Sequence, residues 1–280
     1  MKKVFSWIFK NELALMVSFF VLLAITTISL TLLYDYIPII IRKSIYGEIS
    51  FWEGFLVNLH NSVFDFLILG VMLYYFTNRI SEKRKIEEYH SNIDDTRFWF
   101  REEATSKIVA NINRLNQNGH TKINLSKCFL KDAHLRNVKI INSELMGTVL
   151  EGATLRGAIL TGSDFKGAKL QNVNFNGASL NEAKMKYIFC DKTNFTGANL
   201  TNTDFKQARL INSNFKSAIF KGADLNKAEF DNSSFIKANF IGAKNIDINN
   251  IVKAKTLKGS KFDIQIKLII DSIKPELFEN

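Results

Sequence analysis

The chain has 280 residues, of which 46% are hydrophobic and 12% aromatic, and its formal net charge is +10. Most of this charge lies in residues 121–280, which hold 24 Lys or Arg against 15 Asp or Glu, and this basic balance argues against a protein that imitates the acidic surface of DNA. The length fits one modest domain together with a second part of different character.

Two apolar segments near the N-terminus predict a membrane anchor over residues 1–77. The first, residues 13–34, has 22 residues without a charge, enough for a retained helix to cross a bilayer core. The most apolar part of the second, residues 55–76, runs from Ser62 to Phe76, about 22 Å of helix, so a membrane span here must include the polar turns before Ser62.

Basic residues flank these two segments unevenly. The connecting residues 35–54 contain only Arg42 and Lys43. The two outer flanks hold more basic residues: Lys2, Lys3, Lys10, Arg79, Lys83, Arg84 and Lys85. The positive-inside rule therefore predicts that both termini are cytoplasmic and that residues 35–54 lie outside.

His60, Asn61 and Asp65 fall within the second predicted span and are candidate functional residues, because polar groups are costly in hydrocarbon. In the interpretation we prefer, the helix starts near Ser62 and the polar turn lies among the lipid headgroups. The alternative gives these residues a role between helices or along a pore. Asn61 and Asp65 are four residues apart and would share a helix face.

Residues 78–120 predict a helical connector and an N-terminal cap. The charged run 79–89 continues the second span as a solvated helix, and Asp94–Asp95 predicts a turn. A further helix from Glu102 to Asn118 places Ile108, Ile112 and Leu115 on one stripe and stops before Gly119.

Residues 121–244 repeat with a period of five. Every fifth residue from Leu125 to Phe240 is apolar, at 24 positions without a slip, and a small residue usually stands two places earlier. This period fits neither a helix nor a strand, so the repeat itself must be the structural unit. We expect both positions to face an interior in which only a methyl or hydroxyl group fits at the small position.

This pattern, as in GANLTNTDFKQARLINSNFKSAIFKGADLNKAEF, resembles the pentapeptide-repeat family with its tandem A(D/N)LXX motif. The resemblance implies an all-β solenoid, a right-handed quadrilateral β-helix of about six coils with four pentapeptides per coil. The connection before the repeat resembles that of membrane-anchored members. We therefore expect a multi-pass protein of a bacterial plasma (inner) membrane.

Residues twenty apart should stack on one face of such a solenoid. Phe129, Val149 and Phe189 share an outward column, and Tyr187 stands beside Phe189 where Ile188 replaces the usual small residue. Whatever part of this surface the 102–118 helix leaves uncovered is the best candidate for binding a protein partner.

Other positions on the repeat have structural interpretations. Asn174, Asn194 and Asn214 predict an amide ladder with hydrogen bonds between coils. Cys128 and Cys190 lie about three coils apart, too far for a disulfide, and are expected to be reduced, buried fillers.

The period is lost after Ala243, and residues 245–280 predict a C-terminal helical cap. Asp247 begins a short helix, and Asp263 begins an amphipathic helix that ends before Pro275. We expect these helices to cover the last coil, because an open edge invites pairing with another chain.

Motifs for metal, nucleotide or hydrolytic chemistry were sought in the sequence and not found. We therefore expect no enzymatic activity, no cofactor and no small-molecule substrate. Nucleic-acid binding is also not expected, because basic residues alternate with acidic ones along the repeat.

Three functions stay open. The first is a membrane-anchored scaffold that presents the solenoid to a protein partner. The second is an effector that oligomerises and perturbs the bilayer through its hairpin. The third is a DNA mimic that protects topoisomerases, a role known among soluble members of the resembling family and disfavoured here by the basic charge.

Overall fold

A computed structural model describes residues 12–33 and 49–279 of the chain. The chain divides into two units, Met1–Lys85 and Ile86–Asn280. Several residues on which the predicted orientation depends lie outside the described ranges: Lys2, Lys3, Lys10, Arg42 and Lys43.

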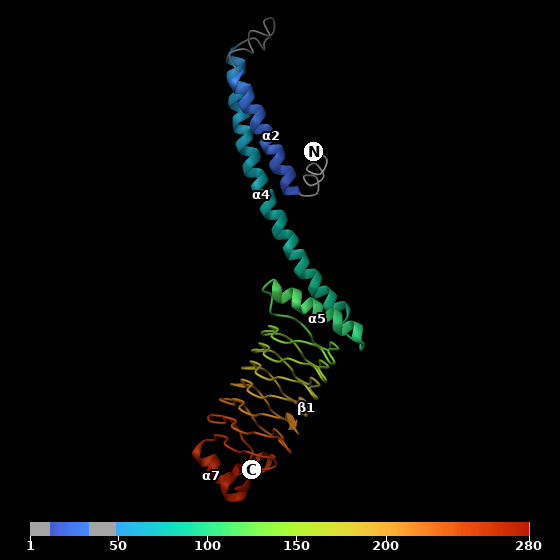
Figure 1. The fold of residues 1–280 in the computed structure, drawn as a ribbon, viewed down its shortest axis with the longest axis vertical. Coiled ribbons are helices and arrows are strands. Elements are labelled where there is room, and N and C mark those ends of the chain that lie inside the picture. Colours follow the sequence, from blue (N-terminus) through green and yellow to red (C-terminus); the bar gives the residue numbers. More distant parts are fainter. Residues whose placement is uncertain (1–11, 34–48, 280) are drawn as a thin grey trace. The chain divides into compact units, whose positions relative to one another are not determined.

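The first unit contains α2 (Glu12–Leu32) and the larger part of α4 (Ile49–Asp95), which lie side by side (Figure 1). The Phe19 and Phe66 rings meet edge to face at 6.3 Å between centroids. The hydroxyls of Thr26 and Thr27 both donate to the carbonyl of Leu23, so these polar side chains are satisfied within the helix.

The preferred start of the second helix near Ser62 is wrong. α4 is continuous for 47 residues from Ile49, so the polar positions 58–61 are helical. Helix continuity depends on backbone hydrogen bonds, and α4 contains no proline to interrupt them. The polar side chains also bond within the helix: Ser62 Oγ donates to the Asn58 carbonyl, and His60 Nδ1 lies 2.7 Å from the Leu56 carbonyl oxygen.

In the second unit, the period of five produces a solenoid. Parallel bridges join residues twenty apart, from Asn124 with Glu144 to Asp224 with Lys244. Two neighbouring coils form short strands, β1 (Phe189–Asp191) and β2 (Arg209–Ile211), while other positions pair through single bridges. The residue at each corner has a positive φ, as at Gly177 (65°) and Asn202 (57°), which explains why Gly and Asn recur there.

The predicted interior register is confirmed: all 24 central residues from Leu125 to Phe240 have no exposed surface. Aromatic rings stack between coils, with Phe195 4.8 Å from Phe215 and Phe215 4.9 Å from Phe235. The coils therefore pack as continuous columns of side chains.

The restriction of the small position to a methyl or hydroxyl group is wrong. Val138, Val173 and Ile188 also point inward at this position and are 4%, 0% and 1% exposed. Ile188 stands two places before Cys190, the smallest of the central side chains, so the larger residue at the small position is accompanied by a smaller one at the centre.

The N-terminal end of the solenoid is closed by α5 (Glu102–Gln117), within one residue of its predicted bounds. Its stripe of Ile108, Ile112 and Leu115 is fully buried. Asn116 accepts a hydrogen bond from the backbone N–H of Lys139 and donates to its carbonyl, at 2.6 and 2.8 Å. The helix thus satisfies part of the open backbone edge.

The C-terminal end combines helices with a continued coil. α6 (Ile248–Ile251), α7 (Ile264–Ile273) and α8 (Glu276–Glu279) form the helical part, and the Asp247 carboxylate accepts from Asn249 N–H as predicted. However, bridges join Ser234 with Thr256 and Asn239 with Lys261. The predicted helical cap, residues 245–280, therefore also contains a stretch that extends the solenoid, with a spacing of 22 residues because α6 is inserted.

Candidate interaction surfaces

The predicted apolar column on the solenoid is interrupted. Bridges run in the order Phe129, Val149, Lys169, Phe189 and Arg209, so a lysine separates Val149 from Phe189. Lys169 occupies this column in the sequence as well, so its place could have been read from the same spacing of twenty. The structure does not bring these apolar residues into one continuous patch.

Each candidate residue on the column has its own local partner. The Phe129 ring meets Phe100 edge to face at 5.9 Å, and the Arg209 guanidinium lies 5.2 Å from the Phe189 ring centroid. Both rings, and the Val149 side chain, are half-buried. From the predicted covering helix, the Thr105 hydroxyl donates a hydrogen bond to the Phe129 carbonyl at 3.0 Å.

Tyr187 is the most accessible of the four candidates on the solenoid. Its side chain is 54% exposed, and the Lys166 ammonium lies 5.8 Å from its ring centroid. Its backbone is left-handed (φ 59°) at a corner where Gly147 and Gly167 stand in the two preceding coils. An aromatic side chain projecting from a corner offers a contact point on an otherwise polar edge.

A ladder of ion pairs covers the face next to this corner. The Lys186 and Lys206 ammonium groups lie 3.2 and 3.0 Å from carboxylate oxygens of Asp204 and Asp224 in the next coil. Burial opposes ionisation of Asp224, but hydrogen bonds from Asn245, Lys206 and the Asn226 N–H lower the pKa of its carboxyl below the ordinary value. The hydrogen bond to Asp224 in turn raises the pKa of Lys206.

The predicted amide ladder forms only in part. Asn194 Nδ2 is 3.5 Å from Asn174 Oδ1, a long contact. The oxygens of Asn174, Asn194 and Asn214 instead accept backbone N–H bonds two residues further on, at 3.0 Å each. These amides therefore stabilise the corners of the coil more than they join one coil to the next.

Both cysteines are free and buried, as predicted. Burial raises the pKa of the Cys128 thiol to about 11 and that of Cys190 to about 12. Both groups are therefore protonated at neutral pH, which makes them poor nucleophiles and poor metal ligands. Within the described residues, no group of three or more His, Cys, Asp and Glu side chains could hold a metal ion.

An apolar surface on α7 was not predicted from the sequence. Ile270 is buried, but Ile264, Leu268 and Ile273 are 79%, 64% and 56% exposed. The sequence of α7 indicated this surface, because six of its ten residues are Ile or Leu, more than a single buried stripe needs.

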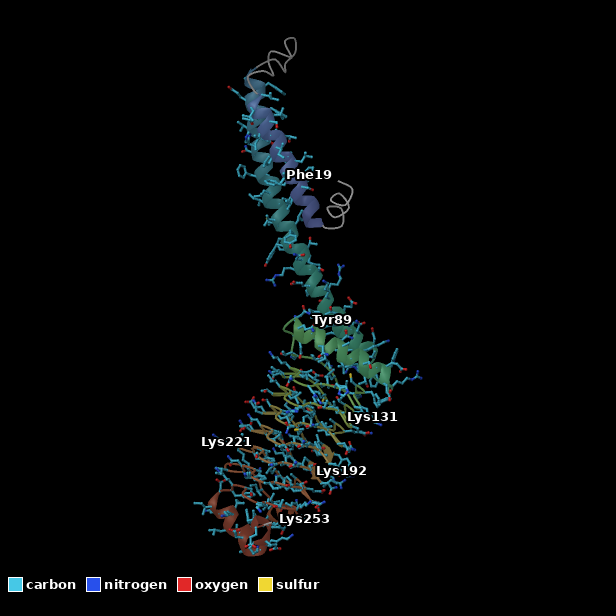
Figure 2. The ribbon with its side chains drawn as sticks, in the orientation of Figure 1. Phe19, Tyr89, Lys131, Lys192, Lys221 and Lys253 are labelled. Carbon is cyan, nitrogen blue, oxygen red and sulfur yellow. The ribbon has the colours of Figure 1, made fainter. Side chains whose placement is uncertain are left out.

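Exposed lysines surround the solenoid and this cap, among them Lys131, Lys192, Lys221 and Lys253 (Figure 2).

On α4 the candidate residues His60, Asn61 and Asp65 are all exposed. Among the described residues, the side chains of Asn61 and Asp65 have no hydrogen-bond or ion-pair partner. The apolar side chains around them are exposed too, including Ile68 (56%) and Val71 (62%).

Comparisons with known proteins identify the repeat. Family models match at two places: the pentapeptide repeat region over residues 158–240 and pentapeptide repeats (8 copies) over residues 121–152. These matches support assignment of the solenoid to the pentapeptide-repeat family. No curated protein matches the chain in sequence.

Solved pentapeptide-repeat structures align with about half of the chain. HetL from Nostoc sp. strain PCC 7120, involved in heterocyst differentiation regulation, is 21% identical, with a TM-score of 0.32 over 51% of this chain and 75% of HetL. Rfr23 from Cyanothece 51142 is 21% identical, with a TM-score of 0.28 over 46% of this chain and 99% of Rfr23. QnrB1, a plasmid-mediated fluoroquinolone resistance protein, is 19% identical, with a TM-score of 0.27 over 54% and 89%.

Proposed function

We propose that this protein is a membrane-anchored, non-enzymatic interaction module. In this proposal α2 and α4 cross the plasma (inner) membrane of a bacterium as a two-span anchor, with both termini in the cytoplasm. The pentapeptide-repeat solenoid presents its outer faces to a protein partner.

The exposure of the apolar part of α4 carries the proposal. Between Glu53 and Asp95 this helix is long and apolar enough to cross a membrane, with a mean hydropathy of 1.6 in its most apolar window. The core helix of a soluble protein would meet the same criterion but would be buried, whereas only 6% of this window is buried. Side chains such as Leu67, Ile68 and Val71, exposed along one helix, favour a lipid environment over water.

α2 supports the same proposal less strongly. Its segment Val17–Leu32 is apolar but shorter than a full span, within the part of the helix whose side chains are described. Val17, Leu22 and Ile28 are 52%, 61% and 57% exposed. Two antiparallel helices cannot bury each other on all sides, so most of this surface is left for lipid.

The solenoid supports recognition through its surface. Its central residues are fully buried, and several outer side chains, among them Asn174, Asp204 and Asp224, are engaged in ion pairs or corner hydrogen bonds. Side chains held by such bonds make the outer faces rigid. Rigid faces suit binding to a protein partner, because fewer side chains must be ordered when the partner binds. The exposed residue Tyr187 and the half-buried residues Phe129, Val149 and Phe189 are the candidate contacts.

An effector that oligomerises through its hairpin is the second candidate function. The observation that favours it is Asp65, a carboxylate without a partner among the described residues, in the apolar part of α4. DNA imitation remains disfavoured, because residues 121–280 are basic.

Washing native membranes with alkaline carbonate, followed by protease treatment of inside-out vesicles, tests the proposal. We expect the full-length chain to stay in the membrane pellet and the solenoid to be cleaved from the exposed cytoplasmic face. Release of the intact chain by carbonate would overturn the anchor, and protection of the solenoid in sealed inside-out vesicles would overturn the orientation. A peripheral membrane protein washed in parallel controls for complete extraction.

A further inference from the structure

One face of α4 has the residue spacing of a helix–helix seam. From Asn58, steps of three and four residues lead alternately to further positions on that face: Asn61, Asp65, Ile68, Met72 and Tyr75. This alternation keeps a single stripe toward a neighbouring helix that crosses at a shallow angle. We call these six residues the α4 seam.

The α4 seam is exposed along its whole length. Asn58, Asn61 and Asp65 are exposed, and Ile68, Met72 and Tyr75 are 56%, 49% and 54% exposed. The seam thus combines a polar half with an apolar half, and at its C-terminal end the Arg79 guanidinium lies 5.6 Å from the centroid of the Tyr75 ring.

α2 occupies a different side of α4. Phe66 contacts Phe19 of α2, and Leu56 is 7% exposed. Leu59, Val63 and Gly70, which share that side of the helix, are less exposed than the seam residues around them. The seam therefore remains available for a second helix.

The polar half of the seam ends at Asp65, near the middle of the apolar stretch. Asp65 is the only Asp, Glu, Lys or Arg between Glu53 and Arg79, twelve residues after the first and fourteen before the second. Its neighbour Phe66 lies opposite Phe19, within the central part of α2 (Glu12–Leu32). Asp65 is thus about 18–21 Å of helix from the flanking charges, too deep for its short side chain to reach the headgroups.

We propose that two copies of this chain associate through the α4 seam, with Asn61 and Asp65 forming hydrogen bonds between the copies. This inference rests on the proposed membrane anchor. Copies of one chain insert with the same orientation, so their α4 helices run parallel and the seam meets itself. The Asn61 amide supplies N–H donors, and the Asp65 carboxyl supplies acceptor oxygens one helical turn away, so each Asn61 can donate diagonally to Asp65 of the other copy.

The residue types along the seam favour this partner. An Asn at one position of a helix–helix seam specifies register and the number of helices, and Asn61 occupies such a position on α4. On the C-terminal side of Asn61 and Asp65, the apolar contacts between the two helices come from Ile68, Met72 and Tyr75. A second copy needs no additional partner residue, because both the donor and the acceptor are present on α4.

Cysteine cross-linking of the full-length chain in native membranes tests this interface. Met72→Cys lies on the seam, while Val71→Cys is a matched control on another side of the helix, since these side chains are 49% and 62% exposed. The native cysteines, Cys128 and Cys190, are buried and should not react. We expect a product of twice the chain mass with Met72→Cys and little with Val71→Cys.

Removing the polar pair measures its contribution. In the Met72→Cys background, Asn61→Leu with Asp65→Leu removes the two equivalent hydrogen-bonded pairs of the symmetric dimer and should weaken association about 8-fold to 300-fold, whereas Asp65→Asn should retain most of it. Equal cross-linking at positions 71 and 72, a cross-linked product containing another protein, or unchanged cross-linking in the double variant would each overturn the inference.

A carbonate wash of the same membranes separates the two proposals. A chain that is retained but not cross-linked at the seam contradicts only the association, while a released chain contradicts the anchor as well.

Discussion

The solenoid buries its apolar side chains, whereas the α2–α4 pair leaves most of its apolar side chains exposed. In the solenoid all 24 central side chains are completely buried, whereas on α4 residues such as Phe64 and Val71 are 65% and 62% exposed. Both regions are rich in apolar residues, so composition does not separate them. The difference lies in whether the local geometry allows the chain to bury its own apolar surface.

A coil of four pentapeptides encloses its side chains on all sides and stacks on its neighbours, so the repeat needs only two end caps. A pair of helices has no such closure, and each helix keeps most of its circumference exposed. The solenoid therefore buries its apolar side chains by itself, while the apolar surface of the helical pair must be covered by the surrounding medium or by another helix. The following predictions test this contrast.

Phe215→Asp should produce the largest loss of stability. Phe215 has no exposed surface and stacks between Phe195 and Phe235, so the change removes an aromatic core side chain and buries a carboxylate without a partner. We expect the free energy of unfolding to fall by more than about 4 kcal/mol. Urea unfolding of the full-length chain in detergent, followed by circular dichroism, measures it.

The matched control for this change is Lys216→Asp. Lys216 is exposed on the next position of the same coil, and its column in the neighbouring coils contains no acidic residue. A change of less than about 0.5 kcal/mol is expected. Similar losses for the two variants would contradict the five-residue register.

Val71→Arg compared with Leu268→Arg tests whether equal exposure means equal surroundings. Val71 on α4 and Leu268 on α7 are 62% and 64% exposed. If α4 lies in lipid, arginine there should disfavour insertion by about 2.5–3.5 kcal/mol, while Leu268→Arg should leave membrane retention unchanged. The fraction retained after a carbonate wash is the measurement, and equal retention of both variants would count against the anchor.

The five-residue period made the interior register of the solenoid predictable, because each position repeats the same environment. Features without a period were harder to predict. The 22-residue spacing to Thr256 depends on the inserted helix α6, and the sequence shows no repeat there. The continuity of α4 through Asn58 and His60 was missed because hydropathy was used to place a helix end that backbone hydrogen bonding determines.

The candidate site was predicted less well than the fold. Stacking at a spacing of twenty correctly placed Phe129, Val149 and Phe189 in one column, but a partner surface also requires continuity, which Lys169 breaks. The exposed face of α7 depends on which side of that helix meets the last coil, and a pattern of six Ile and Leu residues in ten does not specify this. The repeat pattern does not specify which of these surfaces binds a partner, because binding depends on the individual outward side chains.

Ile188 and Cys190 offer a finer test of closure in the solenoid. Ile188→Ala should cost at least about 2 kcal/mol through the cavity it leaves, and Cys190→Leu about 1–3 kcal/mol through overpacking. Since the two side chains share the interior of one coil, the double variant should lose less than the sum of the single losses. Strictly additive losses in urea unfolding would show that the volumes at these positions are independent.

The smallest expected effect concerns the ion-pair ladder on the outside of the solenoid. Hydrogen bonds from Asn245, Lys206 and the Asn226 N–H lower the pKa of Asp224, although burial acts in the opposite direction. A carboxyl whose pKa is lower in the folded state stabilises the fold above its unfolded pKa of about 3.9, and this contribution is lost as the pH falls through the folded value. Because the Lys206 and Asp224 pair is partly exposed, we expect a small contribution to stability, reduced further by salt. Asp224→Asn should therefore lower stability slightly at pH 7 and make stability fall less steeply below a pH of about 4. The control is Asp231→Asn, because the Asp231 carboxyl has no side-chain partner among the described residues. We expect neither effect from this control. Urea unfolding across this pH range compares the two variants, and identical pH profiles would show that the ladder contributes nothing measurable beyond the buried interior.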